Sequence, residues 1–338
     1  MLYNPTRLMF ITTLFLGTLI TVSSSSWLGA WVGLEINLLS FIPLMSQNNR
    51  FAAEAALKYF LVQALASAVL LFSVLLTFLV LPSGLPSIPD LLMAPLSSSL
   101  FLKMGAAPFH FWFPGVMEGL SWIGNLILMT WQKIAPIMLI SYLLTFNLFF
   151  TMIILFSILA GSLGGLNQTS LRKIMAYSSI NHLGWMVAAC ILGDNLWLIY
   201  FLFYVFLSFV MVLIFNQFQL SHISQTYSFG VMNTPSKLLL FGNLLSLGGL
   251  PPFLGFLPKW LIIQSMAQES LYFLITFMVT FTLITLFFYI RIAYSAYMLT
   301  HQEPSWNSIP TPINPLTLYM SVISLAGLSL SSMILVLL

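Results

Sequence analysis

The chain has 338 residues, of which 60% are hydrophobic and 5% are charged, and its formal net charge is +3. Soluble proteins carry roughly 25% charged residues, so this composition excludes a soluble globular protein and predicts one whose solvent is mostly lipid. The single cysteine, Cys190, excludes an internal disulfide and any iron–sulfur or thiolate zinc site built from this chain alone. With no metal-ligand spacing among the histidines and no glycine-rich phosphate motif, we expect no nucleotide, metal or redox centre here, and no nucleic-acid partner.

Apolar stretches long enough to cross a bilayer as helices recur from one end of the chain to the other. A spanning helix needs about 20 mostly apolar residues. With that length as a ruler, eleven spans are predicted, at 6–22, 27–46, 54–80, 91–111, 118–143, 147–165, 173–192, 195–217, 236–266, 271–297 and 316–338. The longest connections, 218–235 and 298–315, are too short for a soluble domain. The predicted fold class is therefore all-α and integral to the membrane.

Basic residues near the span ends predict the orientation. If the connections alternate from one side of the membrane to the other, the N-terminal side holds seven basic residues and the opposite side none; the seven are Arg7, Arg50, Lys58, Arg172, Lys173, Lys237 and Arg291. Basic residues collect on the inner side of membranes. The N-terminus is therefore expected inside and, after eleven spans, the C-terminus outside.

Two segments align without gaps, GAAPFHFWFP at 105–114 and GLPPFLGFLP at 249–258. They lie in the fourth and ninth predicted spans, five spans apart, so they should cross the membrane in opposite directions, as in an inverted repeat. The prediction is one repeat over 1–145, a second over 146–298, and a C-terminal helix over 316–338. Each segment carries a pair of prolines that should break its helix, namely Pro108 with Pro114 and Pro252 with Pro258. Broken helices at membrane depth tend to line cavities, although two ordinary proline kinks are the alternative.

Four charged residues lie inside predicted spans: Glu35, Lys103, Lys133 and Lys259. A charge at the bilayer centre costs roughly 2.5–3.5 kcal/mol on insertion scales, and such groups usually mark ion or proton paths. Desolvation favours the neutral form of a lysine and a nearby carboxylate favours the charged form, so a lysine near a glutamate can load and release a proton. Glu35, the one acidic residue well inside a span, is the expected partner of one of the lysines. A buried ion pair that only fixes helix packing is the alternative.

Three further residues are weaker candidates for proton transfer. His110 lies in the first proline-containing segment and His182 lies in the seventh span. A histidine can relay protons near neutral pH, but it can equally hydrogen-bond a neighbouring carbonyl. Lys58, near the inner end of the third span, serves either in proton uptake or as a lysine whose ammonium reaches the membrane surface.

Five runs together resemble a known family: EAALKYFLVQALASAVLLF, FLKMGAAPFHFWFP, TWQKIAP, NQTSLRKIMAYSSINHLGWM and GLPPFLGFLPKW. They are similar, in order and over nearly the whole chain, to the Mrp-type antiporter-like membrane subunits of respiratory complex I. The resemblance implies two inverted five-helix repeats, each with a broken helix. It also implies a proton path through residues that match Glu35, Lys58, Lys103, Lys133 and Lys259. The chain departs from the fourteen-helix family pattern by lacking three N-terminal helices, which is typical of animal mitochondrial members.

The resemblance implies a proton-translocating subunit of NADH:ubiquinone oxidoreductase in the mitochondrial inner membrane, with the N-terminus in the matrix and the C-terminus in the intermembrane space. NADH, FMN, iron–sulfur clusters and ubiquinone would be bound elsewhere in the complex. The partners would be lipid and other membrane subunits, including other antiporter-like ones. Two alternatives stay open, a standalone cation/proton antiporter and a purely structural membrane subunit. The scarcity of mid-membrane carboxylates argues against sodium transport, and the four buried charges argue against a structural role alone.

Overall fold

A computed structural model describes residues 5–46, 49–80, 88–143, 147–227, 234–298 and 314–337. The predicted connections at 218–235 and 298–315 fall partly outside these ranges. In the described part, the first of them contains a short helix, α11 (Ile223–Tyr227). Apart from one isolated β-bridge between Ser170 and His222, the regular structure of the described residues is helical, which confirms the predicted all-α class.

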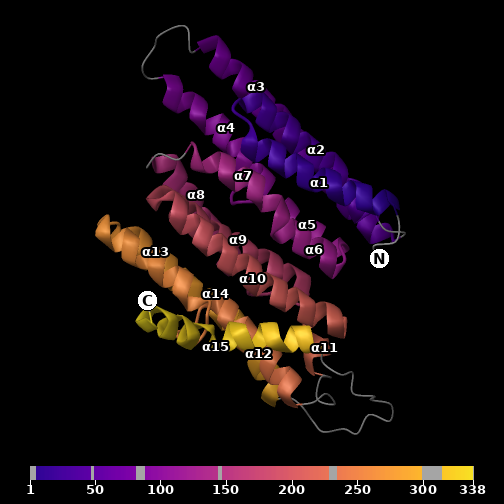
Figure 1. Ribbon diagram of the computed structural model, residues 1–338, viewed down its shortest axis with the longest axis vertical. Helices are drawn as coiled ribbons and strands as arrows, with labels where there is room; N and C mark the ends of the chain where they lie inside the picture. Colours follow the sequence, from indigo (N-terminus) through magenta and orange to yellow (C-terminus); the bar gives the residue numbers. More distant parts are fainter. Residues whose placement is uncertain are drawn as a thin grey trace. The chain divides into compact units, whose positions relative to one another are not determined.

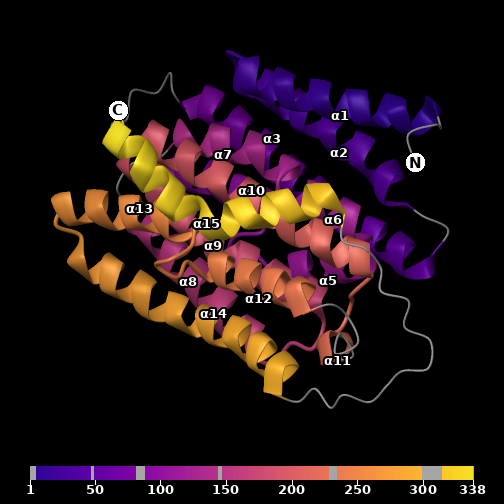
Figure 2. The same cartoon turned by 60° about the horizontal axis from the view of Figure 1, so that its bottom comes forward.

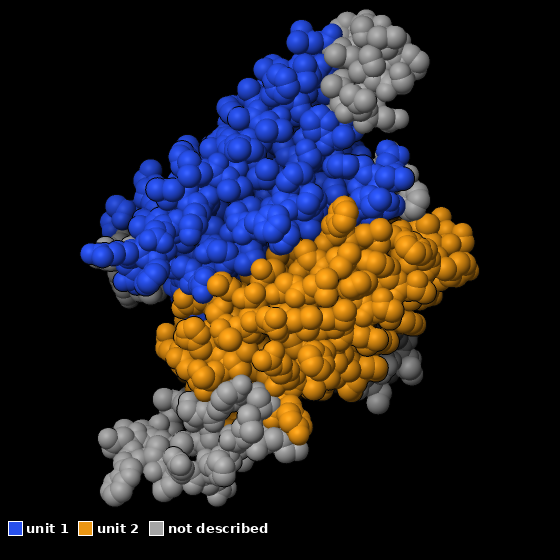
Figure 3. All heavy atoms as spheres, turned by 180° about the vertical axis from the view of Figure 1, so that it is seen from behind, with its two compact units in different colours: residues 1–153 blue, residues 154–338 orange. Residues whose placement is uncertain are grey.

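The chain divides into two compact units, residues 1–153 and 154–338 (Figure 3). The helices of unit 1 are α1 (Pro5–Ser23), α2 (Trp27–Met45), α3 (Arg50–Val80), α4 (Ile88–Met104), α5 (Trp112–Gly119), α6 (Trp122–Met129) and α7 (Trp131–Ser141) (Figure 1). Helix α8 (Leu148–Gly165) begins in unit 1 and ends in unit 2. The remaining helices of unit 2 are α9 (Leu171–Leu192), α10 (Asp194–Phe218), α11, α12 (Thr234–Gly248), α13 (Phe256–Gln268), α14 (Tyr272–Met298) and α15 (Pro315–Leu337) (Figure 2).

Eight helical segments in the described ranges are long and apolar enough to cross a membrane. They coincide with the first, second, third, fifth, sixth, seventh, eighth and tenth predicted spans. Shorter apolar helices at 237–248 and 315–328 fall within the ninth and eleventh spans. The total of eleven stays a prediction.

Three predicted spans are interrupted. In the fourth, α4 ends at Met104 and α5 resumes at Trp112, so the predicted end at residue 111 falls just before a further helix. The predicted start of the fifth span, at residue 118, lies inside α5, and that span is itself divided at Thr130 into α6 and α7. The ninth is divided into α12 and α13. Hydropathy alone did not place these interruptions, because apolar residues continue through both proline-containing intervals and on either side of Thr130.

Small residues let the helices approach closely, as is common in membranes where packing replaces the hydrophobic effect. A methyl group on Gly17 of α1 would lie 2.9 Å from the backbone nitrogen of Asn37 in α2. Within unit 2, a methyl group on Gly161 of α8 would lie 2.6 Å from the backbone nitrogen of Asn181 in α9. Large apolar side chains are in turn exposed along α1, α3 and α14, as expected where lipid or another membrane subunit covers the surface.

Candidate functional site

The two aligned segments share one local structure at the point where each helix stops. Gly105 and Gly249 have φ angles of 76° and 78°, a left-handed conformation that glycine adopts at little cost. Each is followed by a residue whose N–H donates to the carbonyl five positions earlier, Ala106 to Phe101 at 3.0 Å and Leu250 to Leu245 at 3.4 Å. Both helices therefore end in a Schellman motif. The opposite crossing of the two segments stays a prediction.

The four prolines of these segments divide into two kinds. Pro108 and Pro252 lie in the intervals between helices, where no helical hydrogen bond is lost. Pro114 and Pro258 are each the third residue of the following helix, α5 and α13. The N–H groups of a first helical turn have no partner in the helix, so a proline is tolerated there. The second proline of each pair thus lies in the first turn of the next helix. This refines the expectation that both prolines of a pair would break a helix.

Side chains from other helices satisfy carbonyls freed where α4 stops. The indole Nε1 of Trp112 donates to the carbonyl of Leu102 at 3.1 Å, and the amide Nε2 of Gln63 donates to the carbonyl of Lys103 at 3.1 Å. Unsatisfied carbonyls would be costly in hydrocarbon. Side-chain donors from α5 and α3 therefore stabilise the interrupted end of α4.

Lys103 and Glu35 lie close to each other in unit 1. The Lys103 side chain is buried in the last turn of α4, and the half-buried Glu35 of α2 interacts with it electrostatically. A carboxylate favours the charged state of a neighbouring ammonium, whereas burial opposes it.

Lys133 is almost completely buried, with 1% of its surface exposed, in the first turn of α7. Its ammonium lies 5.2 Å from the ring centroid of Phe113, which follows the first break. The preceding residue, Gln132, donates from Nε2 to Oδ1 of Asn37 at 2.9 Å and accepts from the Tyr59 hydroxyl at 3.4 Å. Hydrogen-bonding side chains of α2, α3 and α7 therefore meet beside this lysine.

Lys259 lies just after the second break, in unit 2, whereas Lys103 lies just before the first. The buried side chain of Lys259 reaches back from α13, and Nζ donates to the carbonyl of Gly248, the last residue of α12, at 2.8 Å. The ammonium lies 5.9 Å from the ring of Trp185 in α9. A methyl group on Gly249 would lie 3.0 Å from the Lys259 Nζ. Gly249, which directly follows α12, thus also leaves room for the lysine.

The variant Gly249→Ala should destabilise the protein by about 2 kcal/mol or more. The added methyl group meets the unfavourable left-handed conformation, at roughly 1–2 kcal/mol, and also crowds Lys259. The matched control is Gly115→Ala in α5, where a methyl group would meet nothing within 4 Å. Heat denaturation of solubilised membranes should show a lowered midpoint for the first variant only. Equal midpoints for the two variants would contradict this account of Gly249.

The weaker candidates differ in their surroundings. His182 is buried, and its Nδ1 lies 2.8 Å from the hydroxyl of Tyr200. His110 is half-buried in the first interval, with its ring centroid 4.3 Å from that of Phe111. Lys58 is exposed on α3, as a lysine that reaches towards the membrane surface would be.

Sequence reasoning overlooked polar side chains near the lysines and near His182. In unit 1 these are Asn37, Tyr59, Gln63 and Gln132. In unit 2, Trp185 lies near Lys259, and Tyr200 and Tyr204 lie near His182. Some of these polar side chains could have been identified from the sequence. Asn37 and Gln132 lie within two residues of Glu35 and Lys133, and uncharged polar residues beside a charge inside a span seldom lack a function.

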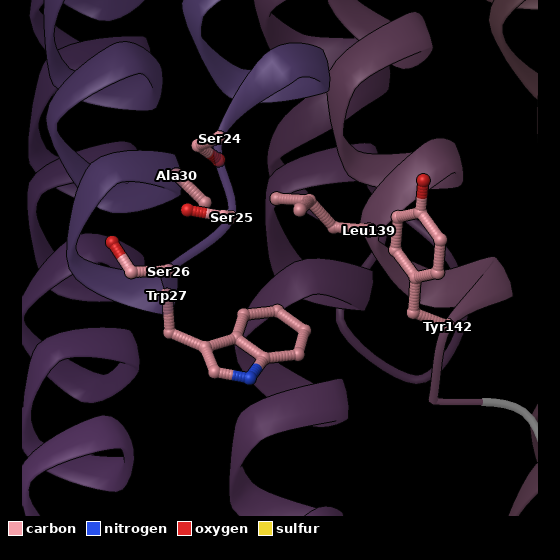
Figure 4. Close-up of a pocket in the computed structure, with 7 residues that line it drawn as sticks. All are labelled: Ser24, Ser25, Ser26, Trp27, Ala30, Leu139 and Tyr142. Carbon is pink, nitrogen blue, oxygen red and sulfur yellow. The ribbon is translucent and has the colours of Figure 1, made fainter.

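In the described part of the chain, neither metal-ligating side chains nor the pocket of unit 1 belongs to this site. Among the described residues, no three His, Cys, Asp or Glu side chains gather closely enough to hold a metal ion. A pocket of about 250 Å³ lies in unit 1 between the start of α2 and the end of α7 (Figure 4). It is lined by Ser24, Ser25, Ser26, Trp27, Ala30, Leu139 and Tyr142. None of the charged residues inside the spans lines this pocket, so we do not assign it to the same function.

Comparison with known proteins identifies the family. The family described as "NADH:quinone oxidoreductase/Mrp antiporter, TM" matches residues 24–285. NADH-ubiquinone oxidoreductase chain 2 of Anopheles gambiae is 55% identical, with 96% of each chain covered.

Two solved structures share the fold. In respiratory complex I from Thermus thermophilus, one chain is 25% identical with a TM-score of 0.85, and 96% of this chain aligns with 78% of that one. A chain of the Mrp complex from Dietzia is 17% identical with a TM-score of 0.77 over 91% of this chain and 62% of that one, a likeness of fold alone. The chain belongs to the NADH:quinone oxidoreductase/Mrp antiporter family of transmembrane subunits.

Proposed function

We propose that this chain is a proton-translocating subunit of respiratory NADH:ubiquinone oxidoreductase in the mitochondrial inner membrane. It spans the membrane several times, with its N-terminus in the matrix and its C-terminus in the intermembrane space. Electron transfer from NADH through FMN and iron–sulfur clusters to ubiquinone takes place in other subunits. This chain contributes proton movement and contacts other membrane subunits, among them further antiporter-like ones.

The observation that carries the proposal is the burial of three lysines inside apolar helices, two of them beside the helix breaks. Lys103, Lys133 and Lys259 are each at most 8% exposed. Burying such groups in a membrane is costly, and helix packing alone does not require it. Each lysine has a neighbour that can favour its ammonium form, namely Glu35, the Phe113 ring and the Gly248 carbonyl with the Trp185 ring.

The proposed mechanism uses these lysines as proton carriers. Energy released elsewhere in the complex changes the charge state of Glu35 and Lys103, and protons then pass by way of Lys133 and Lys259 to the outer side. Moving one charge against the membrane potential costs about 2.3 kcal/mol per 100 mV. A shift of one pKa unit is worth about 1.4 kcal/mol, so several coupled shifts are needed.

Native electrophoresis of gently solubilised membranes tests the assignment. The gel is probed for this chain and stained for NADH oxidation. We expect the chain to migrate with a very large NADH-oxidising assembly, because its relatives are subunits of that enzyme. Migration alone or as a small oligomer without that activity would contradict the proposal. Ion flux in proteoliposomes would then test the standalone antiporter, which predicts a sodium-dependent signal.

A further inference from the structure

Buried hydroxyl groups and an imidazole gather where α9 faces α10 in unit 2. His182 Nδ1 lies 2.8 Å from the Tyr200 hydroxyl, and Ser179 hydrogen-bonds the Tyr204 hydroxyl. The ring centroids of His182 and Tyr204 are 5.1 Å apart. All four side chains are at most 6% exposed. The pair His182–Tyr200 and the pair Ser179–Tyr204 are about one turn apart along both helices, so they are neighbouring contacts between α9 and α10.

A second set of polar side chains joins α9 to α14. Asn181 Nδ2 donates to the Thr285 hydroxyl at 3.4 Å, and one turn away the Tyr289 hydroxyl lies beside Ser178. The Tyr289 hydroxyl and Asn181 Oδ1 are buried, yet neither forms a hydrogen bond of good geometry with the described residues. The Tyr200 hydroxyl interacts electrostatically with those of Tyr204 and Tyr289, so the three tyrosines belong to one neighbourhood of unit 2. Burying polar atoms such as the Tyr289 hydroxyl oxygen and Asn181 Oδ1 without a hydrogen bond is costly inside a membrane.

Lys259 borders this cluster on two sides. Its ammonium donates to the Gly248 carbonyl, and a methyl group on Gly248 would lie 3.4 Å from Tyr289 Cδ2, so Tyr289 packs against the residue that Lys259 binds. The Trp185 ring, 5.9 Å from the same ammonium, lies one turn beyond His182 on α9. Gly248 therefore links Lys259 to Tyr289, and Trp185 links it to the helix that carries His182.

We propose that Tyr200, Tyr204, Tyr289 and His182 form a proton-conducting cluster that exchanges protons with Lys259. The inference rests on the proposed role of Lys259 as a proton carrier, and it adds three tyrosines to the path. In one transfer, the His182 imidazolium releases an N–H proton and becomes neutral. Each intervening hydroxyl accepts one proton as it passes its own onward. The Lys259 amine gains a proton and becomes an ammonium, so only N–H and O–H bonds form or break.

A structural role for the same hydrogen bonds is the rival explanation, because polar side chains also hold membrane helices together. The two roles differ in what the hydroxyls do. A conducting hydroxyl must exchange its proton in each transfer, whereas a structural one need only remain paired. Proton uptake and its solvent isotope effect respond to the first role, and the thermal stability of the complex responds to the second.

The test replaces the three tyrosines by phenylalanine, singly and together, in the intact complex reconstituted into liposomes. Phenylalanine keeps the ring and removes only the hydroxyl. We expect the triple variant to lose NADH-driven proton uptake by at least about a hundredfold, the lower end of what positioned proton-transfer groups contribute. The single variant Tyr200→Phe should show partial loss and an altered solvent deuterium isotope effect. Tyr177→Phe is the matched control, because Tyr177 lies on α9, the helix of His182, but packs against Gly164, and it should leave proton uptake unchanged.

The outcomes separate this inference from the proposed function. If Lys259→Met abolishes proton uptake but the tyrosine variants retain it, the cluster is overturned and the function of Lys259 stands. If Lys259→Met itself has no effect, the proposed function fails as well. Should the triple variant not assemble, Tyr200→Phe decides, and a normal proton uptake rate with a normal isotope effect would overturn the cluster.

Discussion

Replacing Lys259 with methionine should abolish proton pumping by the complex that contains this chain, with the complex still assembled. Methionine has a similar length and suits an apolar helix, but it can neither carry a proton nor donate to the Gly248 carbonyl, which Lys259 contacts at 2.8 Å. The lost hydrogen bond costs about 1–3 kcal/mol of stability. The lost proton carrier should reduce NADH-driven proton uptake at least about a hundredfold, the lower end of what a positioned proton-transfer group contributes. Fluorescence quenching of a pH-sensitive dye in proteoliposomes measures this uptake.

Lys259→Arg is the companion variant that isolates proton exchange from charge. Arginine keeps the positive charge and can still donate to the carbonyl of Gly248, but a guanidinium does not release its proton in a protein. We therefore expect the arginine variant to assemble at least as well as the methionine variant and to pump no better. Full pumping by either variant would show that proton exchange at Lys259 is dispensable.

Replacing Glu35 with glutamine should lower coupled NADH:ubiquinone turnover by about tenfold, since it removes a charge whose interaction with Lys103 is proposed to drive proton loading. Glutamine has nearly the same shape as glutamate, so packing of the half-buried side chain should persist. The control is Glu54→Gln on α3, the same chemical change at an exposed position, which should leave turnover within error of the unmodified complex.

A double-mutant cycle with Lys103→Met tests whether Glu35 and Lys103 act as a pair. Residues that interact directly give non-additive effects, whereas independent ones give additive effects. We expect the double variant to be little worse than the more damaging single one. Fully additive losses, or equal losses in the Glu35 and Glu54 variants, would exclude the pair as the point of coupling.

Composition and hydropathy alone were enough to predict the membrane class and the bounds of most spans. The predicted segment 173–192 differs by two residues or fewer from α9, and 6–22 differs by one residue at each end from α1. This success has a simple cause. A lipid-exposed chain must satisfy its own backbone hydrogen bonds within each segment, so a run of about 20 apolar residues leaves the helix as the available structure.

The interruptions and the surroundings of the charges were not predictable in the same way. The two aligned segments, which begin at Gly105 and Gly249, indicated where two helices are interrupted. The Schellman geometry and the places of the prolines relative to the helix ends depend on the backbone conformation, which apolar composition does not reveal. The division of the fifth span at Thr130 had no sequence signal that we could use.

The sequence by itself determined which side chains are charged inside the spans, because an ionisable residue in an apolar run is visible without any structure. Only the tertiary structure decided which groups each lysine meets: Glu35 near Lys103, Phe113 near Lys133, and Gly248 with Trp185 near Lys259. The same holds for Tyr200 and Tyr204 of α10, which only the packing of α9 brings beside His182. The physical reason is range. Hydropathy acts along one segment, whereas hydrogen bonds and electrostatic contacts join residues of different helices that are far apart in the chain.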